Sequence, residues 1–316
     1  MRREKNRWLI ALSGVAIHLS IGSAYAWSVF KEPIKEMTGW DKSSISFAFS
    51  LAIFCLGTSA AFMGKFVEKF GPRKTGTVAS ILFGLGIVST GFAVSSQSLP
   101  MLYLTYGIIG GIGLGAGYVT PVSTMIRWFP DRKGLATGLA IMGFGFASMI
   151  TGPIAQQLMV RVGVPSTFYI LGIAYFLVMF TASRYLEKPP VGWTPEGFEA
   201  PNPKEEVKVQ YRGVQLTANQ AIKTKTFWLL WFMLFLNITC GISLVSEASP
   251  MAQEITGMTA GMAAAMVGVM GVFNGCGRLV WALISDVLGR KNVFTILFVI
   301  DIVVLLSLSV VSSPLL

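Results

Sequence analysis

The sequence predicts an all-α fold, a polytopic membrane bundle of apolar helices. Hydrophobic residues make up 53% of the 316 residues, charged residues make up 13%, and the mean hydropathy is +0.65. This composition is too apolar for a soluble domain with a polar surface. Stretches of about 20 nearly uncharged residues, the length that crosses a bilayer, recur along the chain. They are rich in Gly and Ala and do not alternate in polarity, which favours helices over the strands of a membrane barrel.

Nine such stretches follow one another, and we expect each to form a membrane-spanning helix. They are residues 8–30, 43–64, 75–96, 100–126, 134–160, 166–183, 227–246, 258–285 and 293–313. The polar, proline-containing segment 186–225 separates the sixth stretch from the seventh. We expect it to be a cytoplasmic linker between an N-terminal unit, residues 1–185, and a C-terminal unit, residues 226–316.

The basic residues predict the orientation of the chain in the membrane. Twenty of the 25 lysines and arginines lie in the N-terminal tail, in residues 65–74, 127–133 and 184–225, or at Arg290 and Lys291. The positive-inside rule then predicts a cytoplasmic N-terminus and a location in the inner (cytoplasmic) membrane. Because these residues are spread one loop at a time, the net charge of +10 gives no reason to expect nucleic-acid binding. The three cysteines lie within spans, so we expect neither a metal site nor a cofactor.

Arg278 is the one charged residue in the eighth stretch. An arginine within a span costs roughly 2.5–3.5 kcal/mol on insertion scales, so its presence requires a reason. Its planar guanidinium can donate two parallel hydrogen bonds to a carboxylate, and Gly275 and Gly277 leave room for a ligand or a helix nearby. The alternative is a side chain that extends to the membrane edge near Asp286, about 12 Å away along the helix. We expect Arg278 to bind a small anion.

Three further polar residues lie at depths where side chains should face protein or water. Tyr25 is a candidate substrate ligand, although aromatic residues are also common at the membrane interface. His18 titrates near physiological pH and is a candidate for proton coupling; a hydrogen bond between helices is the alternative. Asp301, among apolar neighbours in the ninth stretch, has the same two interpretations.

A short motif occurs twice, each time between two spans: an acidic residue, then glycine three positions later, then basic residues. Its first copy contains Gly64, Glu68, Lys69, Gly71, Arg73 and Lys74, and its second copy contains Asp286, Gly289, Arg290 and Lys291. Glycine permits a tight turn there, and the charges can pair across the ends of the helices. We expect both copies to control a conformational cycle rather than ligand binding.

These motifs resemble a known family when they are combined with three others. The others are Gly-Ser-Ala-Tyr-Ala-Trp at residues 22–27, the segment from Arg127 to Gly138, and Asn274-Gly275-Cys276-Gly277-Arg278. Together, and in the order in which they occur along the chain, these motifs resemble those of the oxalate/formate antiporter family of the major facilitator superfamily. This family is related to the monocarboxylate transporters. The second loop motif differs from the family pattern, because Ala282 stands where a leading glycine is usual.

The resemblance implies a secondary active transporter of small organic anions that works by alternating access, and not an enzyme. It implies the superfamily fold, with a complete N-terminal six-helix half and three helices of the C-terminal half. Nine spans instead of twelve suggest that the chain is truncated after the ninth. Arg278, Tyr25 and Tyr118 match positions that contact the substrate in the family, and we add Asn274 from the same motif as Arg278.

The residue before Tyr25 bears on the choice of substrate. Oxalate-carrying members of the family have a glutamine there, whereas this chain has Ala24 and lacks that donor for a second carboxylate. We therefore expect a monocarboxylate such as lactate, pyruvate or formate, with oxalate:formate antiport as the alternative. The expected partners are this carboxylate, a proton and the lipid bilayer, and at full length we expect a monomer.

Two other classes of protein explain the sequence less well. An anion channel gives no reason for a motif repeated in two halves. A membrane enzyme should show a nucleophile with its base, or paired acids, within the spans. One histidine and scattered carboxylates do not supply these groups.

Overall fold

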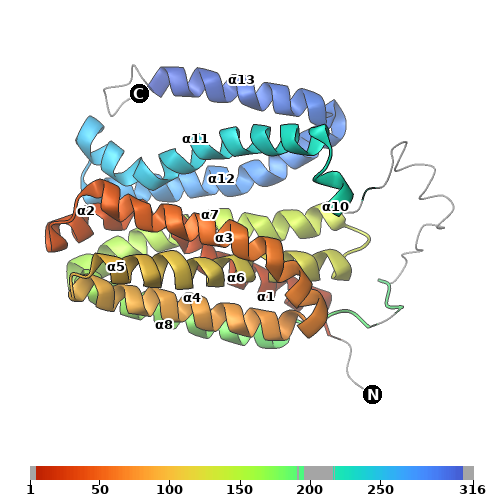
Figure 1. The fold of residues 1–316 in the computed structure, drawn as a ribbon, viewed down its shortest axis with the longest axis horizontal. Coiled ribbons are helices and arrows are strands. Elements are labelled where there is room, and N and C mark those ends of the chain that lie inside the picture. Colours follow the sequence, from red (N-terminus) through yellow and green to blue (C-terminus); the bar gives the residue numbers. More distant parts are fainter. Residues whose placement is uncertain (1–4, 191, 196–215, 217, 309–316) are drawn as a thin grey trace. The chain divides into compact units, whose positions relative to one another are not determined.

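The computed structural model of the protein describes residues 5–190, 192–195, 216 and 218–308, and every regular element in these residues is a helix (Figure 1). This confirms the predicted all-α class. Eight helices are long and apolar enough to cross a membrane, and they coincide with the first eight predicted stretches. The ninth stretch, 293–313, overlaps α13 (Arg290–Leu308), a helix of 19 residues whose last residue is the last one that the structure describes.

Several spans are longer than predicted or combine more than one kind of helix. The first consists of α1 (Arg7–Ile21), the 3₁₀-helix η1 (Gly22–Ala26) and α2 (Trp27–Thr38). The fourth consists of α5 (Leu99–Leu102), the π-helix η2 (Tyr103–Gly110) and α6 (Gly111–Trp128). The other elements are α3 (Lys42–Phe70), α4 (Pro72–Ser95), α7 (Lys133–Val162), α8 (Val164–Tyr185), α10 (Ala218–Ala221), α11 (Lys225–Thr256) and α12 (Ala260–Leu288).

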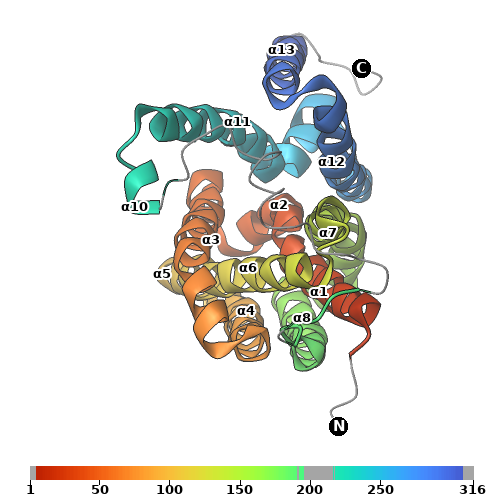
Figure 2. The same ribbon diagram turned by 90° about the vertical axis from the view of Figure 1, so that its right-hand side faces the viewer.

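Contacts group the chain into two compact units, residues 1–189 with 246–316 and residues 190–245. In the larger unit, α4 packs against α8 and α6, α1 packs against α6 and α7, and α7 packs against α12 (Figure 2). Most of the predicted linker, at residues 191, 196–215 and 217, lies outside the described residues. The division of the chain into residues 1–185 and 226–316 therefore stays a prediction.

The two loop motifs form similar turns. Gly71 separates α3 from α4 with φ of 84°, and Gly289 separates α12 from α13 with φ of 80°. Glycine adopts this left-handed region without the strain that a Cβ would cause. Glu68 of the first motif pairs with Arg127 at the end of α6, at 3.4 Å. The side chains of Asp286 and Arg290 lie outside the described residues, so their role in the second motif stays a prediction.

Asp41 caps the N-terminus of α3. Its carboxylate accepts hydrogen bonds from the Ser43 hydroxyl and, at 2.7 and 3.1 Å, from the Ser44 hydroxyl and backbone N–H. These bonds hold the pKa of Asp41 well below its usual range.

We expect Asp41→Ala to lower the melting temperature of the protein at pH 7, because the cap is lost. The cap stabilises the folded protein fully above the ordinary aspartate pKa of about 4, where the carboxylate is ionised in both the folded and the unfolded chain. This stabilisation is lost as the pH falls through the lower pKa that Asp41 has in the folded protein. Asp41→Asn should retain most of the stability, since an amide oxygen also accepts. Thermal unfolding of the three proteins in detergent would measure this, and equal melting temperatures for Asp41→Ala and the parent would contradict it.

Candidate functional site

The 3₁₀ segment η1 positions Tyr25. A Cβ atom on Gly22 would lie 2.2 Å from the carbonyl oxygen of Phe144, so glycine is what allows the first span to approach α7 at this point. A 3₁₀-helix has three residues per turn, so the segment changes which face of the span each later side chain occupies. Tyr25 is half-buried, while its neighbours Ala24 and Ala26 are buried.

A second close approach positions α12. A Cβ atom on Gly145 of α7 would lie 2.6 Å from both the Cα and the backbone nitrogen of Gly275. The two backbones therefore meet where neither residue has a side chain. Gly275 lies three positions before Arg278, so this contact holds Arg278 close to the side of the first span that carries Tyr25.

The guanidinium of Arg278 has three neighbours. Its Nε donates to the Asn274 Oδ1 atom at 3.2 Å, and its Nη2 donates to the Tyr25 hydroxyl oxygen at 3.5 Å. Its Cζ atom lies 5.8 Å from the centre of the Phe144 ring. Three residues singled out from the sequence, Arg278, Asn274 and Tyr25, thus come together from α12 and η1. None of the ion pairs among the described residues involves Arg278.

Phe144 is the centre of this group, and sequence reasoning did not identify it. Its buried ring lies 4.8 Å from the Tyr25 ring, 5.7 Å from the Tyr118 ring and 6.5 Å from the His18 ring, centre to centre, each in an edge-on arrangement. Tyr118 therefore joins the site through Phe144. The sequence feature that could have drawn attention to Phe144 is its position between two glycines, Gly143 and Gly145, within a span.

The two candidates for proton coupling have different surroundings. His18 is completely buried, its ring centre lies 5.3 Å from that of Tyr118, and its Nδ1 donates to the Gly14 carbonyl at 3.1 Å. Because a carbonyl can only accept, this bond places a proton on Nδ1. Asp301 is half-buried on α13, and the contacts around Arg278 do not include it. Coupling through either residue stays a prediction.

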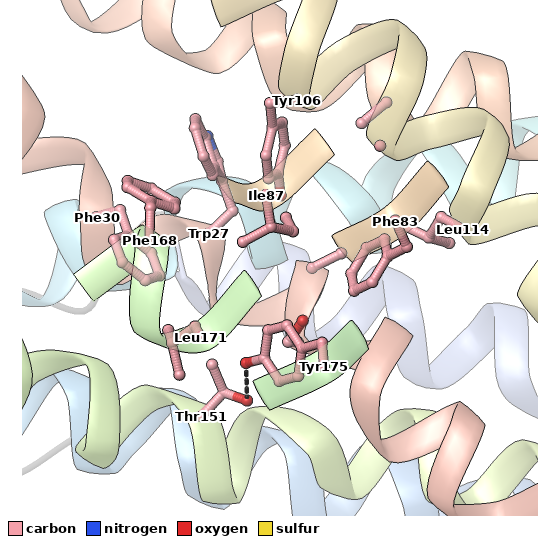
Figure 3. A pocket seen from close by; sticks show the side chains of 14 residues that line it. Trp27, Phe30, Phe83, Ile87, Tyr106, Leu114, Thr151, Phe168, Leu171 and Tyr175 are labelled. Carbon is pink, nitrogen blue, oxygen red and sulfur yellow. Dashed lines mark hydrogen bonds between the residues drawn. The ribbon is translucent and has the colours of Figure 1, made fainter. Parts of the chain in front are cut away.

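Ala24 does not face Arg278. It lines a separate cavity of about 20 Å³ inside the N-terminal helices, together with Trp27, Tyr106 and Tyr175. Figure 3 shows this cavity, its aromatic lining and the 3.1 Å hydrogen bond between the hydroxyls of Tyr175 and Thr151.

The site has the chemistry of an anion-binding site. It combines one guanidinium, one amide and two phenols against an aromatic wall, and Tyr25 and Arg278 are half-buried. The hydroxyl of Tyr25 accepts from Arg278, so its own hydrogen remains available to donate to the same ligand. Within the described residues, no group of three His, Cys, Asp or Glu side chains is arranged to hold a metal ion.

Comparisons with known proteins agree on one fold and one family. Residues 12–316 match the family profile described as Major Facilitator Superfamily. The chain is 31% identical over 303 residues to YhjX, an uncharacterized MFS-type transporter of Escherichia coli (strain K12), and covers 71% of it. It is 28% identical over 303 residues to the oxalate:formate antiporter of Oxalobacter formigenes and covers 68% of that protein. Each alignment includes 95% of this chain.

The fold is similar to a solved structure with little sequence identity. A bacterial homologue of the human lysosomal transporter Spinster, crystallised in an inward-facing and unoccupied conformation, superimposes with a TM-score of 0.65 at 16% identity. The match covers 90% of this chain and 64% of that one.

Proposed function

The chain belongs to the major facilitator superfamily, and we propose that it carries small monocarboxylate anions, such as lactate, pyruvate or formate, across the membrane by alternating access. Members of this superfamily are transporters and not enzymes, and the chain is a multi-pass membrane protein. We further propose that its N-terminus is cytoplasmic and that its membrane is the inner membrane, because of the distribution of lysine and arginine.

One observation carries the proposal: Arg278 is held by neutral groups within a span. Asn274 and Tyr25 accept from Nε and Nη2, and no carboxylate of the described residues pairs with the guanidinium. A cation at this depth is costly unless it is paired or hydrated. A small anion that enters from solution would supply the missing charge, and the low dielectric of a closed site would strengthen the pair.

The contacts also suggest how one carboxylate would be bound. Asn274 engages Nε and Tyr25 engages one hydrogen of Nη2, but each terminal nitrogen of Arg278 carries two hydrogens, so the edge formed by the two terminal nitrogens can still donate to the two oxygens of a carboxylate. The Tyr25 hydroxyl can donate to the same group. The described site offers one guanidinium, which suits a ligand with a single carboxylate. Oxalate:formate exchange is the second candidate, supported by similarity to a protein of that name.

Counterflow would test the transport function and distinguish a carrier from an anion channel. Vesicles containing the purified protein and labelled formate or lactate should release label faster when unlabelled substrate is added outside. A channel would not show this exchange, since flow through a pore does not require a bound substrate on the return path. A screen of acetate, formate, lactate, pyruvate and oxalate at two pH values would identify the substrate and test proton coupling. Absence of exchange with all five would contradict the proposal.

Removal of the two phenol hydroxyls should have unequal effects. We expect Tyr25→Phe to raise the apparent KM about two- to tenfold, because it removes one neutral hydrogen bond worth about 0.5–1.5 kcal/mol. Tyr118→Phe should have a smaller effect, since the Tyr25 hydroxyl accepts directly from Arg278, whereas Tyr118 joins the site through its ring contact with Phe144. Initial uptake rates over a range of substrate concentrations would measure both. A larger loss for Tyr118→Phe than for Tyr25→Phe would contradict the proposed geometry.

A further inference from the structure

Trp27 is a buried tryptophan whose indole N–H has no acceptor in the described part of the fold. It is the first residue of α2, directly after η1, and only 2% of it is exposed. Its Nε1 atom is buried and makes no hydrogen bond with any described residue. A buried donor without an acceptor loses its hydrogen bond to water and does not replace it, which is unfavourable. Buried N–H groups are therefore usually paired, either with protein or with bound water.

Trp128 provides a comparison within the same bundle. It is also 2% exposed, and its Nε1 donates to the Glu187 carbonyl oxygen at 2.7 Å. The fold thus supplies one buried indole with a protein acceptor and supplies none to Trp27 among the described residues. This difference points to a partner of Trp27 that is not part of the chain.

The aromatic ring that lies against Trp27 does not accept its N–H. The Trp27 and Tyr106 rings are stacked, with their centres 4.0 Å apart and their planes 28° apart. The N–H bond lies in the plane of the indole, so it runs alongside the Tyr106 ring and not toward its face. A hydrogen bond to an aromatic ring requires the N–H to point at that face. The rings of Phe30 and Phe168 are farther away, at 6.4 Å from centre to centre.

The indole borders a space large enough for a partner. Trp27 lines the cavity of about 20 Å³ inside the N-terminal helices (Figure 3). On the same scale, roughly 10–15 Å³ is enough to hold one water molecule, and such a water needs about two to four polar partners. Besides the indole, the wall of the cavity provides the hydroxyl groups of Ser23, Tyr106, Thr151 and Tyr175. Cavities that stay dry are apolar, and this one is not.

The size and the charge of the cavity restrict its ligand. A volume of about 20 Å³ suits one water molecule and is too small for formate or a larger carboxylate. The residues that line it include no lysine, arginine, histidine, aspartate or glutamate, so an ion would be buried there without a counter-charge. The ligand that fits is therefore small and neutral, and it both accepts and donates hydrogen bonds.

We propose that this cavity is a binding site for one water molecule, which accepts a hydrogen bond from the Trp27 indole and donates to the hydroxyl oxygens of the wall. A water molecule can accept and donate at the same time, as this combination of one N–H and several hydroxyls requires. The site is separate from the candidate anion site, and the inference does not depend on the proposed substrate.

The position of the water gives it a structural role. Ser23 and Ala24 of η1 line the cavity, whereas Tyr25, the next residue, is hydrogen-bonded to Arg278. The bound water thus lies behind the segment that presents Tyr25 to the anion site. It fills the space between η1 and the π-helix η2, which contributes Tyr106, and these are the two irregular helical segments of the bundle.

Oxidation by hydroxyl radicals would test the site without a transport assay. X-ray radiolysis forms these radicals from water, and they react with side chains in contact with the water from which they form. In the full chain, embedded in lipid nanodiscs, mass spectrometry would measure the oxidation rate of each tryptophan. Trp27 should be oxidised about fivefold faster than Trp128 or more, although both are 2% exposed, because only Trp27 contacts a bound water. Trp8, which is 48% exposed, gives the rate for contact with bulk solvent.

Gly110→Ala would fill the site. Gly110 lines the cavity, and an added Cβ atom there would have one neighbour within 4 Å, the Thr105 carbonyl oxygen at 3.3 Å. The methyl group should take the space of the water and lower the oxidation rate of Trp27 to that of Trp128. Gly57→Ala is the matched control, because it adds the same group to a glycine of α3 where nothing lies within 4 Å. It should leave the oxidation rate of Trp27 unchanged.

The comparison of Trp27 with Trp128 needs no variant, so the proposal can be tested even if Gly110→Ala does not fold. Equally slow oxidation of the two residues would overturn it, because the cavity would then be dry. Equally fast oxidation would also overturn it, since bulk water would then reach both indoles. If thermal unfolding shows that Gly110→Ala is folded, an undiminished rate at Trp27 would place the source of the radicals outside the cavity and overturn the assignment.

Discussion

Arg278→Lys should reduce uptake at low substrate concentration by about ten- to a hundredfold, which is the largest functional effect that we expect from a conservative exchange. Lysine keeps the positive charge but loses the planar fork that matches a carboxylate. It also loses the Nε contact with Asn274 that orients the group. A hydrogen bond to a charged group is worth about 1.5–3 kcal/mol, which corresponds to this range of affinity.

Initial rates of labelled monocarboxylate uptake, normalised to the amount of inserted protein, would measure the loss. Arg161→Lys is the matched control, because Arg161 is exposed in the last turn of α7 and has no place in the proposed site. It should transport at the parental rate. Uptake by Arg278→Lys within twofold of the parent would show that Arg278 does not bind the substrate through its fork.

Gly145→Ala should impair both transport and stability, because the added methyl group meets the backbone of another helix. The new Cβ would lie 2.6 Å from the Cα and nitrogen of Gly275, and backbone atoms cannot rotate away as a side chain could. Helices α7 and α12 must then separate, which moves Arg278 away from Tyr25. Overpacking of this kind typically costs about 1–3 kcal/mol, and a shift of about 1 Å at a site can reduce activity about a hundredfold.

Gly261→Ala on α12 is the control, since its added methyl group would meet nothing within 4 Å. It should leave uptake and melting temperature close to those of the parent. Thermal unfolding in detergent and initial uptake rates would compare the two variants. A parental melting temperature and parental uptake in Gly145→Ala would show that the α7–α12 contact is looser than the structure indicates.

The class of the fold, the positions of the first eight spans and the family could all be predicted from the amino-acid sequence alone. These follow from local properties: a run of about 20 apolar residues is sufficient to identify a span, whatever it packs against. Gly71 and Gly289 were identifiable as turns for a similar reason, since the left-handed backbone there depends on one residue. Arg278 was prominent because a charge in an apolar run is costly in any bundle.

Which side chains meet in the candidate site could not be predicted from the sequence. Phe144 is an ordinary aromatic residue in the sequence, and it becomes the centre of the candidate site because η1, α6 and α12 converge on it. The 3₁₀ segment that carries Tyr25 depends on contact between Gly22 and α7, and its sequence showed no break. Ala24, beside Tyr25, faces a different cavity.

The same limit applies to Lys31, which lies just after the first predicted stretch, 8–30, and which the fold buries against Glu247, 216 residues away. Periodicity can say that a residue lies on a helix, but not which neighbour covers its face. Which face is covered depends on close approaches such as that of Gly145 and Gly275, where two backbones from distant parts of the chain must both lack side chains. A close contact of this kind cannot be predicted from either helix alone, because its energy depends on the residues that both helices place at the point of contact.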